Sequence, residues 1–252
     1  MKKLIAHLRY WLKIKPKWNQ CRYASCWDGE NAVRRMMNIL SPYFSDGKFQ
    51  EYVDWMLSRG CNTAHLFLIN GGDGEGAGYN CATDNWHATI ARRRIRKLRL
   101  AGLAVVPWLI ADDSAAAARD LFKNPEARVK SLAAAELFDH ASYVVIGLEM
   151  DEPRSFPDGP IYWPKVAAAL RGVYSGKLGT HHCSGNSFRY ADLGDIVLGQ
   201  LPESCTPSQI RNQIATIQAK GKQAVGFEYQ RNPNRDKAMA ALDAGAVGVG
   251  NW

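Results

Sequence analysis

Residues 143–153 read Tyr143-Val-Val-Ile-Gly-Leu-Glu-Met-Asp-Glu152-Pro153, an apolar run that ends in acidic residues. A second run of the same kind, Gln223-Ala-Val-Gly-Phe-Glu228, ends in a glutamate. Short apolar runs bounded by turn residues are typical of buried strands. Amphipathic stretches separate such runs along the chain, and strands that alternate with helices in this way form parallel sheets.

The same unit recurs over most of the 252 residues. We predict strands near 20–27, 61–69, 103–110, 143–149, 178–182, 195–200, 223–228 and 246–250. We predict helices near 47–59, 87–101, 114–139, 161–174, 206–220 and 233–243. Helix starts are marked by Ser45-Asp46 and Thr206-Pro207. Glycines of the kind that end helices in the left-handed conformation stand at Gly60, Gly102, Gly176, Gly221 and Gly245.

Eight strands predict an α/β protein with a single (β/α)8 barrel over residues 18–252. A doubly wound open sheet is the alternative. Residues 1–17 form a separate unit, a basic amphipathic helix whose apolar stripe includes Leu4, Leu8 and Trp11. No eighth helix follows the last predicted strand, so we expect this N-terminal helix to fill the gap or to cover the bottom of the barrel.

The net charge of +8 is concentrated in two segments. Residues 1–18 and 87–101 hold 12 of the 32 basic residues and no acidic ones, so the rest of the chain is slightly acidic. Two basic helix faces explain this distribution, and a patch that binds an anionic partner is the alternative. No nucleic-acid-binding motif accompanies the charge, so we expect no nucleic-acid partner.

The six cysteines show no zinc-ligand spacing, and we expect neither a metal nor a cofactor. The N-terminus is charged and lacks a clean apolar signal segment, and no apolar run is long enough to span a bilayer. We therefore expect a chain that is cytoplasmic or released by lysis. The oligomeric state is not predicted.

The predicted strands end in polar and aromatic residues. In a parallel barrel these carboxyl ends open on one face, where the active site lies. Besides Glu152 and Glu228, the candidate substrate-binding residues are Trp27, Trp108, Glu149, Asp151, His182, Gln200, Tyr229 and Trp252. Carboxylates and amides that meet hydroxyls, with tryptophans that meet ring faces, are typical of a sugar-binding site.

Three of these strand ends resemble the retaining glycoside hydrolases of clan A. The run that ends in Asp151-Glu152-Pro153 is similar to the strand-four Asn-Glu-Pro motif of that clan. Gly226-Phe-Glu228 resembles its strand-seven nucleophile, and Gly250-Asn-Trp252 resembles its strand-eight tryptophan. The three motifs lie on the fourth, seventh and eighth predicted strands, in the order of the clan.

The resemblance implies a carbohydrate substrate, with Glu152 as the acid/base and Glu228 as the nucleophile. Carboxyl groups about 5–5.5 Å apart would indicate retention, and ~6.5–9.5 Å inversion. Asp151 stands where the clan has Asn, and Glu149 and Asp151 are alternatives for the acid. The glycan is not predicted; plant polysaccharide, bacterial capsule and peptidoglycan are candidates.

Other functions remain open on the sequence. The acidic run 147–152 also faintly resembles chitinase-like barrels, which use the acetamido group of the substrate as nucleophile. Residues 241–250 resemble the phosphate-binding segment of another class of barrel enzymes, although Glu228 would be unfavourable beside a phosphate. A carbohydrate-binding barrel without catalysis is the non-enzymatic alternative. His181-His182 suggests a metal site, but neighbouring strand residues face opposite sides, so at most one would face the centre.

Overall fold

The structure, a computed structural model, describes residues 23–24, 45–58, 60–70, 78–110, 115–154, 156–183, 187–200, 205–228 and 235–251. Its strands are β1 (Tyr23–Ala24), β2 (Thr63–Asn70), β3 (Tyr79–Asn80), β4 (Ala104–Ile110), β5 (Val144–Val145), β6 (Leu178–His182), β7 (Ile196–Gln200), β8 (Gln223–Glu228) and β9 (Gly248–Asn251). Its helices are α3 (Asp46–Ser58), α4 (Asn85–Leu100), α5 (Ala115–Lys123), α6 (Pro125–Ala134), α7 (Gly159–Arg171), α8 (Pro207–Ala219), α9 (Arg235–Asp243) and the 3-10 helix η1 (Ala191–Leu193). The predicted helix over residues 1–17 lies outside the described residues.

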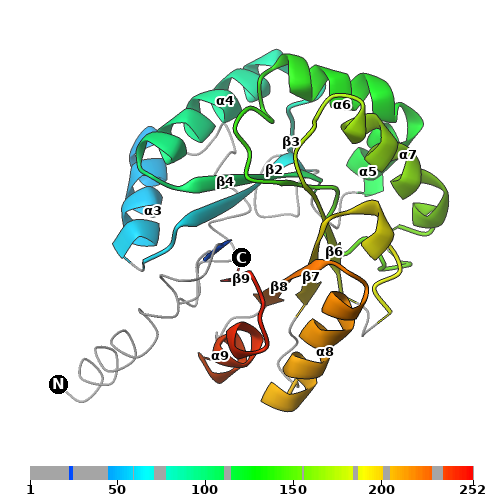
Figure 1. The fold of residues 1–252 in the computed structure, drawn as a ribbon. Coiled ribbons are helices and arrows are strands. Elements are labelled where there is room, and N and C mark those ends of the chain that lie inside the picture. Colours follow the sequence, from blue (N-terminus) through cyan, green and yellow to red (C-terminus); the bar gives the residue numbers. More distant parts are fainter. Residues whose placement is uncertain are drawn as a thin grey trace.

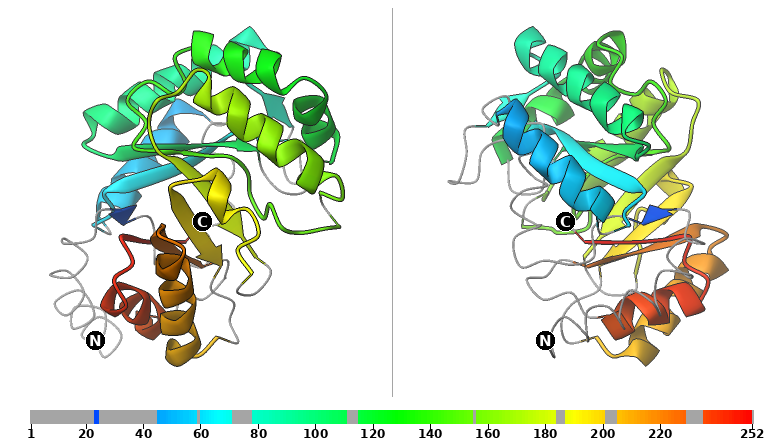
Figure 2. Two further views of the ribbon diagram at one scale, coloured as in Figure 1. Left: turned by 45° about the vertical axis from the view of Figure 1, so that its right-hand side comes forward. Right: turned by 90° about the vertical axis from the view of Figure 1, so that its left-hand side faces the viewer.

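The strands form one curved sheet with helices on its outside (Figures 1 and 2). The strand order is β1-β9-β8-β7-β6-β5-β4-β2-β3, and all pairs are parallel except β2 with β3. From β2 to β9, apart from the short β3, the strands pair in sequence order, and the first strand, β1, pairs with the last, β9. A doubly wound sheet reverses its order in the middle, so this arrangement is that of a (β/α)8 barrel. The predicted fold class is confirmed.

The core lies on both faces of this sheet. On β7, Ile196 and Leu198 belong to one apolar cluster, while Val197 between them packs in a second cluster with α8 and α9. This alternation follows from the two-residue period of a strand. Apolar residues on both faces explain why the strands read as continuous apolar runs rather than as alternating ones.

Most element boundaries agree with the predictions to within two or three residues. Thr206 and Gln209 form a reciprocal capping box at the start of α8. Positive φ angles occur at four of the predicted helix-ending glycines, which are Gly60, Gly102, Gly221 and Gly245. Gly176 is not among the residues with positive φ, and it packs against the ring of Tyr174.

Two predictions of secondary structure were wrong. The single helix predicted over 114–139 is two helices, α5 and α6, which meet at Asn124 and Pro125. Proline lacks the amide hydrogen that a continuous helix needs, and it is tolerated as the first residue of a new helix. The short antiparallel strand β3 was not predicted; Asn70 pairs with Tyr79 there, and the Tyr79 hydroxyl donates to the carbonyl of Phe67 at 3.0 Å.

The basic segment 87–101 forms α4, and much of its charge is paired. Arg93 donates to Asp46 at 2.9 Å, and Arg96 donates to Glu136 at 2.8 Å. Arg94 is buried, with its guanidinium over the ring of Phe49. Exposed ion pairs of this kind contribute little stability, but they reduce the positive field that the sequence suggested. Within the described ranges, no helix is long and apolar enough to cross a membrane.

Substitution of Gly147 by Ala is expected to destabilise the barrel. A Cβ atom at Gly147 would lie 2.7 Å from Cη2 of the buried Trp163 on α7. Overpacking of this kind costs about 1–3 kcal/mol, measurable as a lower free energy of unfolding in urea. Gly47→Ala is the control, because its Cβ would have only Ser45 Oγ at 4.0 Å. Equal effects of the two substitutions would contradict the packing of Trp163 against the strand.

Candidate active site

The carboxyl ends of neighbouring parallel strands bring several predicted site residues to one edge of the sheet. His182 ends β6, Gln200 ends β7 and Glu228 ends β8. In the register of the sheet, Gln200 pairs with Phe227, and Glu228 pairs with Asn251 at the end of β9. The acidic residues Glu149–Glu152 follow β5 on the other side of β6.

The segment that follows β5 remains bound to both neighbouring strands after the last strand residue. The amide of Ile146 donates to the carbonyl of Gly179 on β6, and the amide of Leu148 donates to that of Ile110 on β4. The chain then turns at Glu149, which has a φ of 44°. A residue other than glycine in this region costs about 1–3 kcal/mol, and such residues cluster at functional sites.

Two hydrogen bonds that His181 accepts hold this turn. The amide of Glu149 donates to Nδ1 of His181 at 2.9 Å, and the amide of Met150 donates to the carbonyl of His181 at 3.0 Å. A third bond closes the turn on itself, from the amide of Glu152 to the carbonyl of Glu149 at 2.9 Å. On the outer side, Nε1 of Trp163 donates to the carbonyl of Met150 at 3.0 Å. The backbone that carries the acidic residues is therefore bound to β6 and to α7.

The carboxylate of Asp151 is directed toward the end of β6. It accepts a hydrogen bond from the amide of Cys183 at 2.9 Å and lies 3.6 Å from Nδ1 of His182. The Asp151 side chain is 3% exposed and that of His182 is fully covered. Both residues were predicted to bind substrate; in the structure His182 is buried at the end of β6, and Asp151 accepts the hydrogen bond from the residue that follows it, Cys183.

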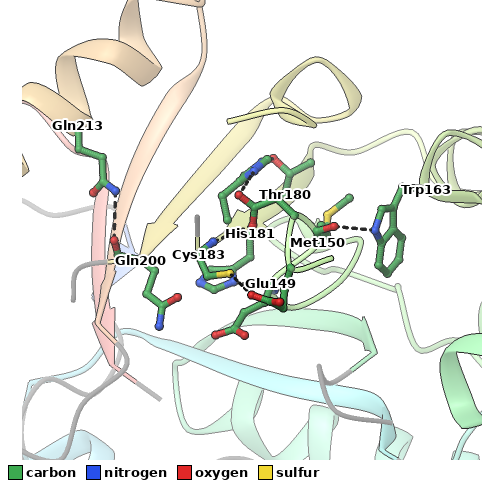
Figure 3. A network of polar contacts seen from close by, with 11 residues as sticks. Glu149, Met150, Trp163, Thr180, His181, Cys183, Gln200 and Gln213 are labelled. Atoms are coloured by element: carbon green, nitrogen blue, oxygen red, sulfur yellow. Dashed lines mark hydrogen bonds and ion pairs between the residues drawn. The ribbon is translucent and has the colours of Figure 1, made fainter. Parts of the chain in front are cut away.

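Glu149 and Glu152 are both half-buried. Oε1 of Glu152 accepts a hydrogen bond from the amide of Arg154 at 3.0 Å, and Oε2 lies 4.0 Å from Sγ of Cys183. Figure 3 shows Glu149, Cys183 and Gln200 gathered at the strand ends, with Gln213 and Trp163 on the helix side. Gln213 donates to the Gln200 carbonyl at 3.1 Å. The structure thus brings together Glu149, Glu152 and Gln200 from the predicted set.

Beneath this edge lies a layer of buried rings from β2, β4 and β6. Nε1 of Trp108 donates to Nδ1 of His65 at 2.8 Å, and the ring of Trp108 lies 5.5 Å from that of His181. Trp108 was predicted as a sugar-binding residue, but its side chain has no exposed surface. In the sheet β2 and β4 are neighbours, and β5 lies between β4 and β6.

Burial determines the charge of the two histidines in this layer. It lowers the pKa of His65 to about 3. It also lowers the pKa of His181 to about 3, and the neighbouring His182 acts in the same direction. Both imidazoles are therefore neutral near pH 7. In the part of the chain that the structure describes, no group of three or more His, Cys, Asp or Glu side chains is placed to hold a metal ion.

Four predicted site residues are not placed as side chains. Trp27, Tyr229 and Trp252 lie outside the described residues, and Glu228 is described by its backbone position at the end of β8. His181 and Cys183 were not among the predicted substrate-binding or catalytic residues. The alternation of a strand indicated that only one of the paired histidines would face the interior, and the ring contacts identify it as His181.

The fold is shared with barrel glycoside hydrolases. An exo-β-1,4-mannosidase from Opitutaceae bacterium strain TAV5 matches with a TM-score of 0.64 at 14% identity, over 85% of this chain and 49% of that protein. An endo-1,4-β-mannanase from Eisenia fetida matches with a TM-score of 0.63 at 14% identity, over 92% of this chain and 84% of that protein. A family 18 chitinase from Pseudoalteromonas aurantia matches with a TM-score of 0.56 at 13% identity, over 91% of this chain and 93% of that protein.

At these identities the likeness shows the fold alone, and the chain spans about half the length of the mannosidase. Other structural neighbours include glycoside hydrolases of families 5 and 113. No family model and no curated protein sequence matches the chain. The predicted resemblance to barrel glycoside hydrolases is confirmed for the architecture, and the roles of individual residues remain predictions.

The stability of the fold is expected to fall as the pH is lowered from about 6.5 toward 3. The folded state holds His65 and His181 with pKa values of about 3, against an ordinary value of 6.5. Stability due to the neutral imidazoles is therefore fully present above pH 6.5 and is lost as unfolding takes up protons below it. Each histidine contributes up to about 1.4 kcal/mol per pH unit in that window.

Urea unfolding from pH 7.5 to 4.5 measures this dependence. His65→Asn and His181→Asn should each make the free energy of unfolding less dependent on pH. His140→Asn, which changes an exposed histidine, should leave the dependence as in the original protein. A slope that is the same in all three variants would contradict the assignment.

Asp151→Ala is expected to destabilise the fold more than Asp151→Asn. Alanine leaves the amide of Cys183 without the carboxylate that accepts its hydrogen bond, a loss of about 1–3 kcal/mol. Asparagine keeps an oxygen in the same position. The free energies of unfolding in urea compare the two variants, and equal losses would show that this hydrogen bond does not hold the turn.

Proposed function

We propose that this protein is a glycoside hydrolase that cleaves a poly- or oligosaccharide with two carboxylates. The observation that carries the proposal is the common location of the acidic residues in one sheet. The turn Glu149–Glu152 follows β5, and Glu228 is the last residue of β8, at the same carboxyl end of the parallel strands. Carboxylates on both sides of a sugar ring are what hydrolysis of a glycosidic bond requires.

In this proposal Glu152 is the acid/base and Glu228 the nucleophile. Glu228 attacks the anomeric carbon while Glu152 gives its proton to the leaving oxygen, which takes the electron pair of the broken bond. A covalent glycosyl-enzyme results. Glu152, now a carboxylate, then takes a proton from water, whose oxygen displaces Glu228, and the configuration at the anomeric carbon is retained.

The half-buried position of Glu152 supports its role. Its backbone is fixed by the bond to Glu149, and one carboxylate oxygen is oriented by the amide of Arg154. Asp151 is engaged with Cys183 and His182, so it is a weaker candidate for the acid than Glu149 or Glu152. We assign Glu149 and Gln200 to substrate binding, since both lie at the carboxyl edge of the sheet (Figure 3), Glu149 after β5 and Gln200 at the end of β7.

A second candidate is a substrate-assisted hydrolase of the chitinase type. Three acidic residues within four positions of one strand end favour it, together with the family 18 chitinase among the structural neighbours. In such an enzyme the acetamido group of the substrate replaces the protein nucleophile. Glu228 would then be dispensable, whereas an acid after β5 would remain essential.

The experiment is the release of reducing sugar from a panel of β-mannan, β-glucan, chitin, bacterial capsule and peptidoglycan. Glu152→Gln should lower kcat on the substrate that is cleaved by on the order of 10²–10⁴-fold, because it removes the proton donor. Glu228→Gln should abolish turnover, because an amide cannot form the glycosyl intermediate. Glu126→Gln, on the exposed side of α6, is the matched control and should keep full activity.

Each result has a separate meaning. Activity that survives Glu228→Gln but not Glu152→Gln would favour the substrate-assisted mechanism, and the cleaved glycan would then be chitin or peptidoglycan. Loss in Glu149→Gln with full activity in Glu152→Gln would move the acid role to Glu149. If the original protein binds a glycan of the panel in affinity electrophoresis but cleaves none, the hydrolase proposal fails and a binding barrel takes its place.

A further inference from the structure

His181 is a buried imidazole that the two-carboxylate mechanism does not use. Its side chain is fully covered and lies on the inner side of β6, against the ring of Trp108. Its Nδ1 accepts the amide hydrogen of Glu149 at 2.9 Å. A backbone amide that donates to an imidazole nitrogen joins the interior of the barrel directly to the turn that carries the acidic residues.

This hydrogen bond requires one form of the imidazole. A ring nitrogen accepts a hydrogen bond only when it carries no proton, so His181 must be neutral with its proton on Nε2. Burial favours the neutral state and lowers the pKa of His181 to about 3. The bond is therefore available throughout the pH range in which most hydrolases work.

The position of the ring is itself fixed. Trp108 packs against it and is held by the hydrogen bond from its Nε1 to His65 on β2. His65, Trp108 and His181 thus form one layer, contributed by β2, β4 and β6. A ring that cannot shift gives a fixed direction to the hydrogen bond that it accepts.

The turn needs such a partner, because Glu149 has a φ of 44° and is not a glycine. A conformation of this kind persists only where the surroundings determine it. The carbonyl of His181 binds the next amide, that of Met150, at 3.0 Å. Together the two contacts determine the orientation of consecutive peptide groups on either side of the Glu149 side chain.

We infer that His181 is a positioning residue, whose Nδ1 holds the amide of Glu149 and thereby sets where the carboxylates of Glu149 and Glu152 lie. The catalytic consequence rests on the proposed hydrolase function, whereas the positioning itself does not. On the other side of the turn, the amide of Cys183, which directly follows β6, donates to the carboxylate of Asp151 at 2.9 Å. The end of β6 therefore supports the acidic turn from two sides.

The hydrogen bond can be measured directly in the unaltered protein. In a ¹⁵N-labelled sample, NMR should show a coupling across the hydrogen bond between the amide nitrogen of Glu149 and Nδ1 of His181, with the ring proton on Nε2. A proton on Nδ1, or absence of the coupling in a spectrum that resolves both nitrogens, would overturn the inference. This NMR measurement requires neither a variant nor a substrate.

Two substitutions test what the bond does. His181→Asn places an oxygen near the position of Nδ1 and should keep the Glu149 amide protected from hydrogen exchange, whereas His181→Leu should speed its exchange at least tenfold. Ile214→Ala is the matched control, because it removes buried side-chain volume from α8, in the apolar cluster on the other face of the sheet. Equal acceleration in Ile214→Ala and His181→Leu would show a general loosening of the barrel and would overturn the inference.

Enzyme kinetics of the same His181 variants test the catalytic consequence. On a glycan that the original protein cleaves, His181→Leu should lower kcat about 100-fold with little change in KM, the effect expected when a catalytic group is displaced by about 1 Å. His181→Asn should restore most of the loss. An unchanged kcat in His181→Leu would overturn the catalytic consequence. If the original protein cleaves nothing, the proposed function fails by itself, and the NMR arms still decide the positioning.

Discussion

The hydrogen bonds between the end of β6 and the turn after β5 are the contacts on which the candidate active site depends. In a parallel barrel the strand ends determine where loops begin, but they do not determine how a loop is oriented. Here the turn begins with a residue at positive φ. The energy of that conformation is offset by the hydrogen bond from the Glu149 amide to His181 and by the one from the Cys183 amide to Asp151. The acidic residues are therefore held by the strand beside them rather than by their own loop.

In this arrangement the acidic side chains differ in direction and in burial. Asp151 is directed toward β6 and is almost fully covered, whereas Glu149 and Glu152 remain half-buried at the strand ends. A carboxylate that accepts a backbone hydrogen bond and faces a histidine is already engaged, so it is less available to a sugar hydroxyl. The aspartate that stands where clan A has asparagine thus has a structural role here that an amide oxygen would also satisfy.

The sequence predicted the barrel well because its signals are local and repeated. Glycines at helix ends, the capping residues Thr206 and Gln209, and apolar runs of strand length each specify an element without reference to the rest of the chain. Pro125 was a local signal as well. The prediction of a single helix across it was wrong because proline has no amide hydrogen to continue the helix. The pair β2–β3 could not be predicted in this way, because it depends on a contact between two segments rather than on a pattern within one.

The sequence predicted which residues stand at the strand ends, such as His182, Gln200 and Glu228, but not the directions of the side chains. A residue at a strand end can face the substrate, the interior or a neighbouring strand, and short motifs do not distinguish these. Trp108 faces the interior, where it binds His65, and Asp151 faces β6. Asp151 follows the turn at Glu149, and nothing in the sequence signals a positive φ at a glutamate.

The contacts on the outer face of β6 raise one further possibility, which their burial excludes. Thr180 Oγ1 lies 3.1 Å from Nε2 of His182, whose Nδ1 lies 3.6 Å from Asp151. The order of a hydroxyl, a histidine and a carboxylate is that of a catalytic triad, although the distance from Nδ1 to Asp151 is longer than a hydrogen bond. A nucleophile must reach its substrate, however, and Thr180 and His182 have essentially no exposed surface. These three residues are therefore part of the packed structure behind the turn, where the Cys183 amide holds Asp151.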